Sequence, residues 1–98
     1  MSSLSKTFKA LSDPTRRKIL ELLKKSSLTA GEISEQFPIS PPSITHHLNL
    51  LKDAELIAQQ RDGRQLIYSL NLSVIEEILK SYYENFSAKG GSASGRKL

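Results

Sequence analysis

Two adjacent prolines, Pro41 and Pro42, constrain this chain more than any other feature of its sequence. Proline lacks a backbone N–H and clashes with the preceding turn, so two prolines cannot lie in the interior of a continuing helix. Both fit the first turn of a new helix, and Ser40 before them is a suitable N-cap. We therefore predict that one helix ends and another begins around Ser40, in the stretch SPPSITHHLNLLKDAELI.

The segment before this break predicts three helices. Leu4, Phe8 and Leu11 recur at helical spacing and mark a short amphipathic segment. Asp13 and Pro14 are placed to cap and to begin a second helix, whose apolar residues between 19 and 23 form one face. A third, shorter helix is expected over LTAGEISEQF, in which the threonine and the first glutamate have capping-box spacing. The fourth then runs over about 41–54.

The sequence changes period beyond residue 54, where β-branched and aromatic residues lie on either side of Asp62 and Gly63. We expect this dipeptide to supply the positive φ angles of a tight turn between two antiparallel strands of about five or six residues. The segment NLSVIEEILKSYYENFSA then predicts a long final helix. The Gly/Ser-rich residues 89–98 cannot bury enough surface to become ordered, so one domain is expected over 1–88.

These elements describe a mainly α fold with a small β-hairpin. The order α-α-α-α-β-β-α, with a tight turn between the third and fourth helices, is the winged helix-turn-helix plan. That plan places the fourth helix in the major groove of DNA and the hairpin, or wing, beside it.

The fourth helix has two different faces. Ile44, Leu48 and Leu51 share one face, which we expect to pack on the core. Hydrogen-bonding side chains remain elsewhere near its N-terminus, where they suit base edges in a major groove. Two arginines at the wing tip suit phosphate or a minor groove. The predicted DNA-contacting residues are Ser40, Ser43, Thr45, His46, His47, Asn49, Arg61, Arg64 and Gln65.

The two histidines have competing interpretations. Adjacent residues on a helix point about 100° apart, so His46 and His47 cannot readily hold one metal ion. We assign His46 to DNA, whereas for His47 a hydrogen bond to a neighbouring helix competes equally with a DNA contact. No nucleophile with a base and an orienting partner accompanies them, so we do not expect an enzyme.

Three blocks of sequence carry a resemblance to a known family. ALSDPTRRKILELL, SPPSITHHLNLLKDAELI and RDGRQLIYSL together resemble the ArsR-type (arsenic-repressor) winged-helix transcription regulators, in particular small autorepressor-like members without metal ligands. The resemblance covers about residues 4–86. It implies a homodimer, formed mainly by the first and last helices, that binds a palindromic operator and represses transcription. It also implies a recognition surface with Ser43, Thr45, His46 and His47, and a wing with Arg61 and Arg64.

The sequence departs from the metal-sensing members of that family. Their sites use a Cys-x-Cys pair on the third helix, or carboxylates and histidines on the last one. This chain has no cysteine, and its last apolar segment has glutamates but no histidine. Metal sensing is therefore disfavoured and no cofactor is expected, although a metal-responsive repressor with an atypical Glu and His arrangement remains an alternative.

The last predicted helix has an apolar stripe wider than a small core can cover. A seam between two copies would bury it, and the first helix would complete the same isologous patch. The alternative, in which the stripe folds back on its own domain, is disfavoured because the other helices already fill a core of this size. The expected seam residues are Leu4, Phe8, Leu11, Ile75, Ile78, Leu79, Tyr82, Tyr83 and Phe86.

Composition excludes some classes of protein and leaves others open. The 98 residues contain no apolar run that could cross a bilayer and no secretory signal, so we expect a cytoplasmic protein without membrane insertion. The net charge of +4 is a weak argument for nucleic acid, because three of the 14 basic residues lie in the tail. A winged-helix protein-interaction module that binds no DNA remains an alternative. The inducer, whether a protein or a small molecule, stays open.

Overall fold

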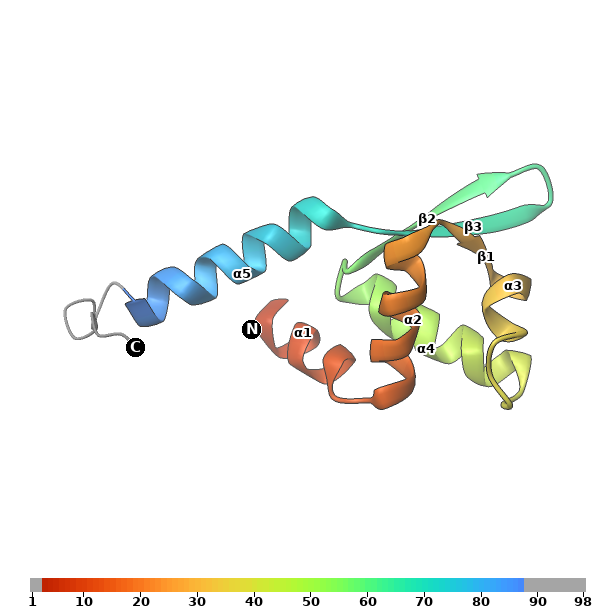
Figure 1. Ribbon diagram of the computed structural model, residues 1–98, viewed down its shortest axis with the longest axis horizontal. Helices are drawn as coiled ribbons and strands as arrows, with labels where there is room; N and C mark the ends of the chain where they lie inside the picture. Colours follow the sequence, from red (N-terminus) through yellow and green to blue (C-terminus); the bar gives the residue numbers. More distant parts are fainter. Residues whose placement is uncertain (1–2, 88–98) are drawn as a thin grey trace.

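The computed structural model describes residues 3–87 and shows a helical body with a small sheet on one side (Figure 1). The first four helices make up the body, and the fifth extends away from it on the side opposite the β-hairpin. The expected tail, 89–98, lies outside the described residues. The elements are α1 (Ser3–Leu11), α2 (Pro14–Lys25), β1 (Leu28–Thr29), α3 (Ala30–Ser34), α4 (Pro41–Asp53), β2 (Ile57–Asp62), β3 (Gln65–Leu70) and α5 (Leu72–Ser87).

The helix N-termini confirm the predicted caps. The Asp13 carboxylate accepts the backbone N–H of Arg16 at 3.0 Å, and Pro14 begins α2. Thr29 and Glu32 form the reciprocal capping box, with bonds of 3.1 and 2.8 Å. Ser40 caps α4 in the same way, which leaves the two prolines in the first turn. Each cap satisfies N–H groups that have no partner inside the helix.

Helix α3 is shorter than the sequence predicted, because it ends at Ser34 instead of continuing to Phe37. The chain then tightens, and the backbone N–H of Phe37 donates to the Ser34 carbonyl three residues back. Pro38 follows, and a residue before proline is disfavoured in the helical region. The short turn that results brings α4 against α3.

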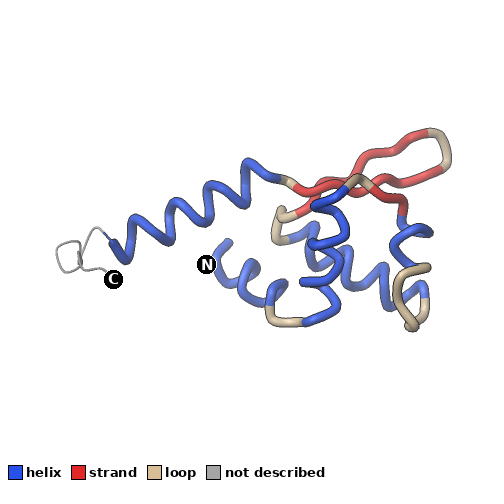
Figure 2. The backbone as a smooth tube through the Cα atoms, in the orientation of Figure 1, coloured by secondary structure: helices blue, strands red, loops and turns tan. Residues whose placement is uncertain are grey.

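The sheet has three strands, in the order β1-β3-β2, whereas the sequence predicted only the hairpin (Figure 2). Strand β1 pairs antiparallel with β3, with Leu28 opposite Tyr68 and Thr29 opposite Ile67. Two residues give no periodic signal, so the strand exists because β3 offers it a partner. It ties the segment between α2 and α3 to the base of the wing.

The wing turn also differs from the prediction. Asp62 pairs with Gln65 as the last residue of β2, so Gly63 and Arg64 form the turn. Only the glycine has a positive φ, of 67°, as in a two-residue hairpin turn with glycine at its first central position. The prediction that Asp62 and Gly63 both supply positive φ angles is therefore wrong, and Arg64 lies at the tip itself.

The core lies where α2, α3, α4 and the base of the sheet meet. Its largest side chains come from the apolar faces that the sequence predicted, and Ile19, Ile44 and Leu48 are at most 1% exposed. Burial raises the pKa of the Tyr68 hydroxyl above 10.0. The buried apolar residues are Ala10, Ile19, Leu23, Ile33, Ile44, Leu48, Leu51, Ala54, Leu56, Ile57 and Tyr68.

A left-handed residue joins α4 to the wing. Glu55 has φ of 62°, and its N–H donates to the Lys52 carbonyl while the next N–H, of Leu56, donates to Leu51. These two bonds form a Schellman motif, whose left-handed position is usually a glycine. The chain leaves α4 in a fixed direction and enters β2.

Helix α5 leaves most of its apolar face uncovered. Ile75 and Ile78 pack against the core, but Leu79, Tyr83 and Phe86 are 63%, 70% and 67% exposed. The radius of gyration is 16.0 Å, against about 13 Å for a compact domain of 100 residues. Within the described residues, no helix has the length and apolar character needed to cross a bilayer.

Candidate nucleic-acid interface

Helix α4 presents two opposite surfaces, as predicted. Ile44, Leu48 and Leu51 fix one side to the core, because each is at most 1% exposed. The first turns of α4 lie at the same end of the molecule as the wing tip, on the side away from α5 (Figure 1). Between Pro41 and Asn49, the exposed polar residues of α4 are Ser43, Thr45, His46 and Asn49.

The start of α4 holds a small hydroxyl pair. Ser40 Oγ accepts the N–H of Ser43 at 3.3 Å and donates to Ser43 Oγ at 3.1 Å. Capping therefore occupies the Ser40 side chain, although the residue is exposed. Ser43 keeps its own hydroxyl hydrogen available to donate. At a helix N-terminus such a donor is well placed for an anionic or carbonyl acceptor.

Thr45 lies at a shallow apolar cavity between α3 and α4. The cavity has a volume of about 360 Å³ and includes Ala30, Gly31, Pro41 and Ile44 in its lining. The α3 side of the cavity is shallow because Ala30 and Gly31 have small side chains or none. A methyl group presented from outside would contact apolar atoms here, and thymine carries such a methyl in the major groove.

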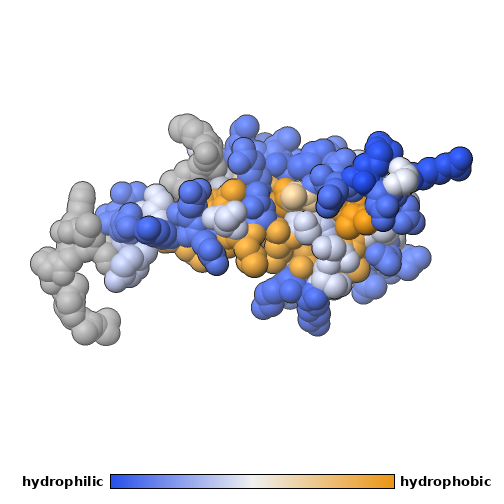
Figure 3. Space-filling view, turned by 90° about the horizontal axis from the view of Figure 1, so that it is seen from above, coloured by the Kyte–Doolittle hydropathy of each residue, from blue (hydrophilic) through white to orange (hydrophobic). Residues whose placement is uncertain are grey.

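The wing tip is strongly hydrophilic. Arg61, Arg64 and Gln65 are all exposed, and Figure 3 shows the hydrophilic side chains at that end of the molecule. Arg61 lies on β2 opposite Leu66, and Arg64 lies in the turn. Two guanidinium groups near one tip can each donate hydrogen bonds to phosphate oxygens.

A hydrogen bond links α4 to the wing. Lys52 Nζ donates to Gln59 Oε1 at 2.6 Å. Neither residue was among the DNA-contacting residues that the sequence predicted. The bond depends on the fold, which brings the end of α4 beside β2.

His47 points toward the body of the protein. Its ring Nδ1 lies 3.1 Å from Arg16 Nη1 and 3.9 Å from Asp13 Oδ2, and its side chain is 16% exposed. Of the two interpretations that the sequence left open, this geometry favours the bond to a neighbouring helix. His46, by contrast, is exposed on the outer side, with its ring centroid 5.9 Å from that of His47.

The charges around His47 shift two pKa values. Burial lowers the pKa of His47 below 6.5 and so do Arg16 and His46, while Asp13 acts in the opposite direction. Burial acts to raise the pKa of Asp13, but the Arg16 N–H bond and the nearby positive groups outweigh it and hold that pKa below 3.8. Both shifts favour a neutral imidazole beside an ionised carboxylate.

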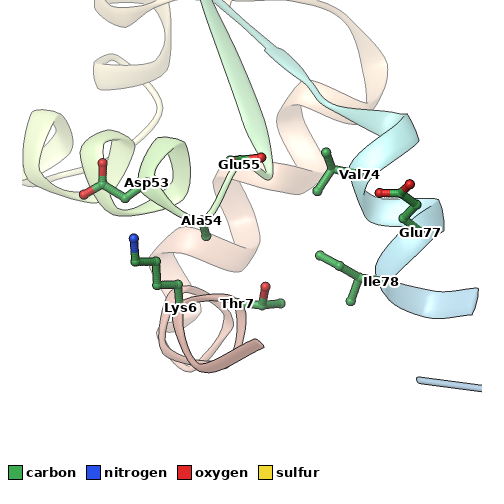
Figure 4. Close-up of a pocket in the computed structure, with 8 residues that line it drawn as sticks. All are labelled: Lys6, Thr7, Asp53, Ala54, Glu55, Val74, Glu77 and Ile78. Carbon is green, nitrogen blue, oxygen red and sulfur yellow. The ribbon is translucent and has the colours of Figure 1, made fainter. Parts of the chain in front are cut away.

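A second cavity lies between α1, the end of α4 and the start of α5 (Figure 4). Its volume is about 340 Å³, and Thr7, Val74 and Ile78 lie on its α1 and α5 sides. Lys6, Asp53, Glu55 and Glu77 surround them. In the part of the chain that the structure describes, no three potential metal-ligating side chains come close enough to hold an ion.

The predicted seam residues divide into two groups. Leu11, Ile75 and Ile78 are half-buried against the core of their own chain. The second group is exposed and consists of Phe8, Leu79, Tyr82, Tyr83 and Phe86. Phe8 and Tyr82 meet edge to face, with ring centroids 6.1 Å apart, and so connect α1 to α5. The Leu4 side chain lies outside the described part.

Known proteins resemble this chain in sequence and in fold. A family model described as "Bacterial regulatory protein, arsR family" matches residues 13–59. The transcriptional repressor SdpR of Bacillus subtilis (strain 168) is 53% identical over 87 residues, which cover 89% of this chain and 96% of that protein.

Solved structures agree. An ArsR-like transcriptional regulator from Rhodococcus sp. RHA1 has a TM-score of 0.81 and 28% identity, over 91% of this chain and 83% of that one. A homodimeric winged helix-turn-helix DNA-binding domain from Mycobacterium bovis, 19% identical, has a TM-score of 0.67 over 85% of this chain and 83% of that one, and shows the fold. The matched family and the Bacillus subtilis relative are regulatory proteins, which confirms the prediction that the chain is not an enzyme. From its sequence and its winged helix-turn-helix fold, the chain belongs to the ArsR family of bacterial regulatory proteins.

Proposed function

We propose that this chain is a homodimeric transcriptional repressor that binds duplex DNA with α4 in the major groove. The observation that carries the proposal is the orientation of α4, whose apolar face is buried while Ser43, Thr45, His46 and Asn49 remain exposed. Packing of the apolar face on the core fixes the direction of the polar face, so base edges would meet a surface that is already in place. We assign the activity to residues 1–88 and the protein to the cytoplasm.

The wing adds contacts that do not depend on sequence. Arg61 and Arg64 at its exposed tip suit the backbone or the minor groove beside the groove that α4 occupies. The name of the Bacillus subtilis relative, a transcriptional repressor, supports the repressor function.

Pairing of two chains is supported by α5. Its exposed face includes Leu79, Tyr83 and Phe86, and Phe8 on α1 continues it. A contiguous apolar surface of this kind marks an association site, and an isologous pair buries the same patch twice. The Mycobacterium bovis domain of the same fold is homodimeric. A two-fold pair presents two α4 helices, so the operator is a palindrome with half-sites about 34 Å apart.

The function is tested by titrating the full chain onto duplex DNA at about 0.05 M and about 0.2 M salt. The DNA is the tightest duplex recovered from a random-sequence library, with a scrambled duplex beside it. We expect a preference for the selected duplex, a two-fold motif within it, and affinity that falls steeply with salt. Absent or salt-insensitive binding would instead favour the protein-interaction module.

The pairing is tested by Leu79→Glu, which places a charge on the apolar face of α5. Ser81→Glu is the matched control, because Ser81 lies on the opposite side of the same helix and is also exposed. Sedimentation should show a dimer for the control and a monomer for Leu79→Glu, with a parallel loss of DNA binding. A dimer that persists in Leu79→Glu would contradict the α5 seam.

A further inference from the structure

A chain of hydrogen bonds connects the recognition helix to the end of α1. His47 on α4 meets Arg16 Nη1 at 3.1 Å. The same guanidinium donates through Nε to the Ala10 carbonyl at 2.8 Å and through Nη2 to the Lys9 carbonyl at 2.9 Å. Arg16 is only 7% exposed, so water cannot easily take the place of its hydrogen-bond partners.

This contact fixes the protonation state of His47. A guanidinium has donors and no acceptor, and it keeps its charge at every pH that a folded protein meets. His47 Nδ1 must therefore accept, which places the single ring proton on Nε2. A second proton could bind only at Nδ1, where it would point at another donor and place two positive charges 3.1 Å apart.

Arg16 cannot move away to accommodate that proton. Two of its nitrogens are bonded to the last carbonyls of α1, the negative end of that helix, and its backbone N–H is bonded to the Asp13 cap. His47 is therefore the partner that would have to move. It has an alternative acceptor in Asp13, 3.9 Å from the same Nδ1, but it reaches that carboxylate only by giving up the Arg16 bond.

We propose that His47 is a positioning residue for DNA binding: its neutral ring accepts the Arg16 bond that holds α4 against the end of α1, and protonation releases α4 and weakens binding. The proposal rests on the DNA-binding function above. It assigns His47 no contact with DNA, and it makes acid pH an antagonist of binding.

The charged groups that face His47 come from several elements. Arg16 on α2 opposes a second proton, the cap residue Asp13 favours it, and His46 on α4 adds a further opposing charge when protonated. On α1, Lys9 and Lys6 line a separate small cavity with Leu50 and Asp53, further along α4. Burial and Arg16 outweigh Asp13, so the pKa of His47 lies below 6.5 and the ring is neutral near pH 7.

Three variants test the proposal against the selected duplex, at about pH 8 and about pH 5. His47→Gln keeps an acceptor for Arg16 but cannot be protonated. His47→Ala leaves the guanidinium without that acceptor. His46→Gln is the matched control, because it removes the neighbouring imidazole and keeps His47.

We expect the wild-type affinity to fall about ten-fold from the higher to the lower pH. His47→Gln should bind within about three-fold of the wild type at the higher pH and lose most of the acid effect. His47→Ala should bind about ten-fold more weakly at both values. His46→Gln changes the affinity itself but keeps the acid loss. Circular dichroism and sedimentation at both pH values establish that each protein is folded and dimeric.

The outcomes separate this proposal from the function on which it rests. A wild type that binds no duplex at the higher pH overturns the DNA-binding function. A wild type that binds but shows no acid loss, or a His47→Gln variant that loses affinity in acid as the wild type does, overturns only the role of His47. If His47→Ala fails to fold, the comparison of His47→Gln with His46→Gln still decides.

Discussion

Lys52 Nζ donates a 2.6 Å hydrogen bond to Gln59 Oε1, and this contact joins the C-terminal end of α4 to strand β2 of the wing. The two elements are the ones that we assign to the major groove and to the adjacent backbone. A hydrogen bond between them limits the angle at which the wing can lie against DNA.

Removal of the hydrogen bond between Lys52 and Gln59 should weaken DNA binding without unfolding the protein. For Gln59→Ala we expect a two- to five-fold loss of affinity, roughly the value of one exposed hydrogen bond. Gln60→Ala is the control, because Gln60 is exposed on the opposite face of β2. Equal affinities of the two variants, measured by fluorescence anisotropy, would show that the bond does not position the wing.

The exposed face of α4 should carry the sequence preference. Replacing Ser43, Thr45 and His46 together by alanine removes three polar side chains that face away from the core. Each good base contact is worth about 1–3 kcal/mol of discrimination, so the ratio of affinities for selected and scrambled duplexes should fall at least ten-fold. If that ratio survives the triple substitution, another surface reads the sequence.

The wing arginines should contribute affinity without preference. Arg61→Ala and Arg64→Ala each remove one exposed cation, so each should weaken binding to both duplexes by a similar factor. The slope of log affinity against log salt should become shallower by about one per arginine. A change in preference with an unchanged slope would place the side chain on a base instead of a phosphate.

The left-handed joint after α4 should respond to glycine. Glu55 has φ of 62°, so Glu55→Gly relieves a side-chain clash and should raise the free energy of unfolding by about 1 kcal/mol. Glu35→Gly is the matched control, because Glu35 is the C-cap of α3 with φ of −65° and gains nothing from glycine. In thermal melting at fixed protein concentration, the Tm of Glu55→Gly should be about 4–8 °C higher than that of the wild type. Glu35→Gly should show no such rise.

Acid should destabilise the fold in two steps. The folded-state pKa of His47 lies below 6.5, so the unfolded chain binds more protons as the pH falls below 6.5, and the free energy of unfolding decreases. Asp13, with a folded-state pKa below 3.8, adds a second decrease below that value. In urea denaturation, His47→Gln should remove the first decrease and Asp13→Asn the second. A first decrease that persists in His47→Gln would contradict the assignment.

Local signals located most of the fold. Pro41 with Ser40 marks the start of α4, and Thr29 with Glu32 marks α3, because caps act within one helical turn. Strand β1 could not be found in this way, since two residues carry no period and depend on β3 for pairing. The turn was misplaced by one residue, because strand pairing at Asp62 decides where β2 ends.

The candidate interface was predictable in part for the same reason. Burial of Ile44 and Leu48 follows from helical spacing, and this fixes the exposure of the residues between them. The direction of His47 does not follow, because it depends on Arg16, which lies on a different helix and is itself fixed by carbonyls of a third. The role of Gln59 was not predicted, because its partner Lys52 lies on α4 while Gln59 lies on β2, and the sequence does not show that these two elements meet.

The uncovered face of α5 has a consequence for how the protein responds to its own abundance. If a lone protomer offers one reading helix and only a pair offers two, site occupancy in dilute solution rises with the square of the protomer concentration. Such a dependence makes site occupancy rise more steeply than protein synthesis does. If α5 pairs two protomers as proposed, the strength of that contact would set the protomer concentration at which a controlled gene is repressed.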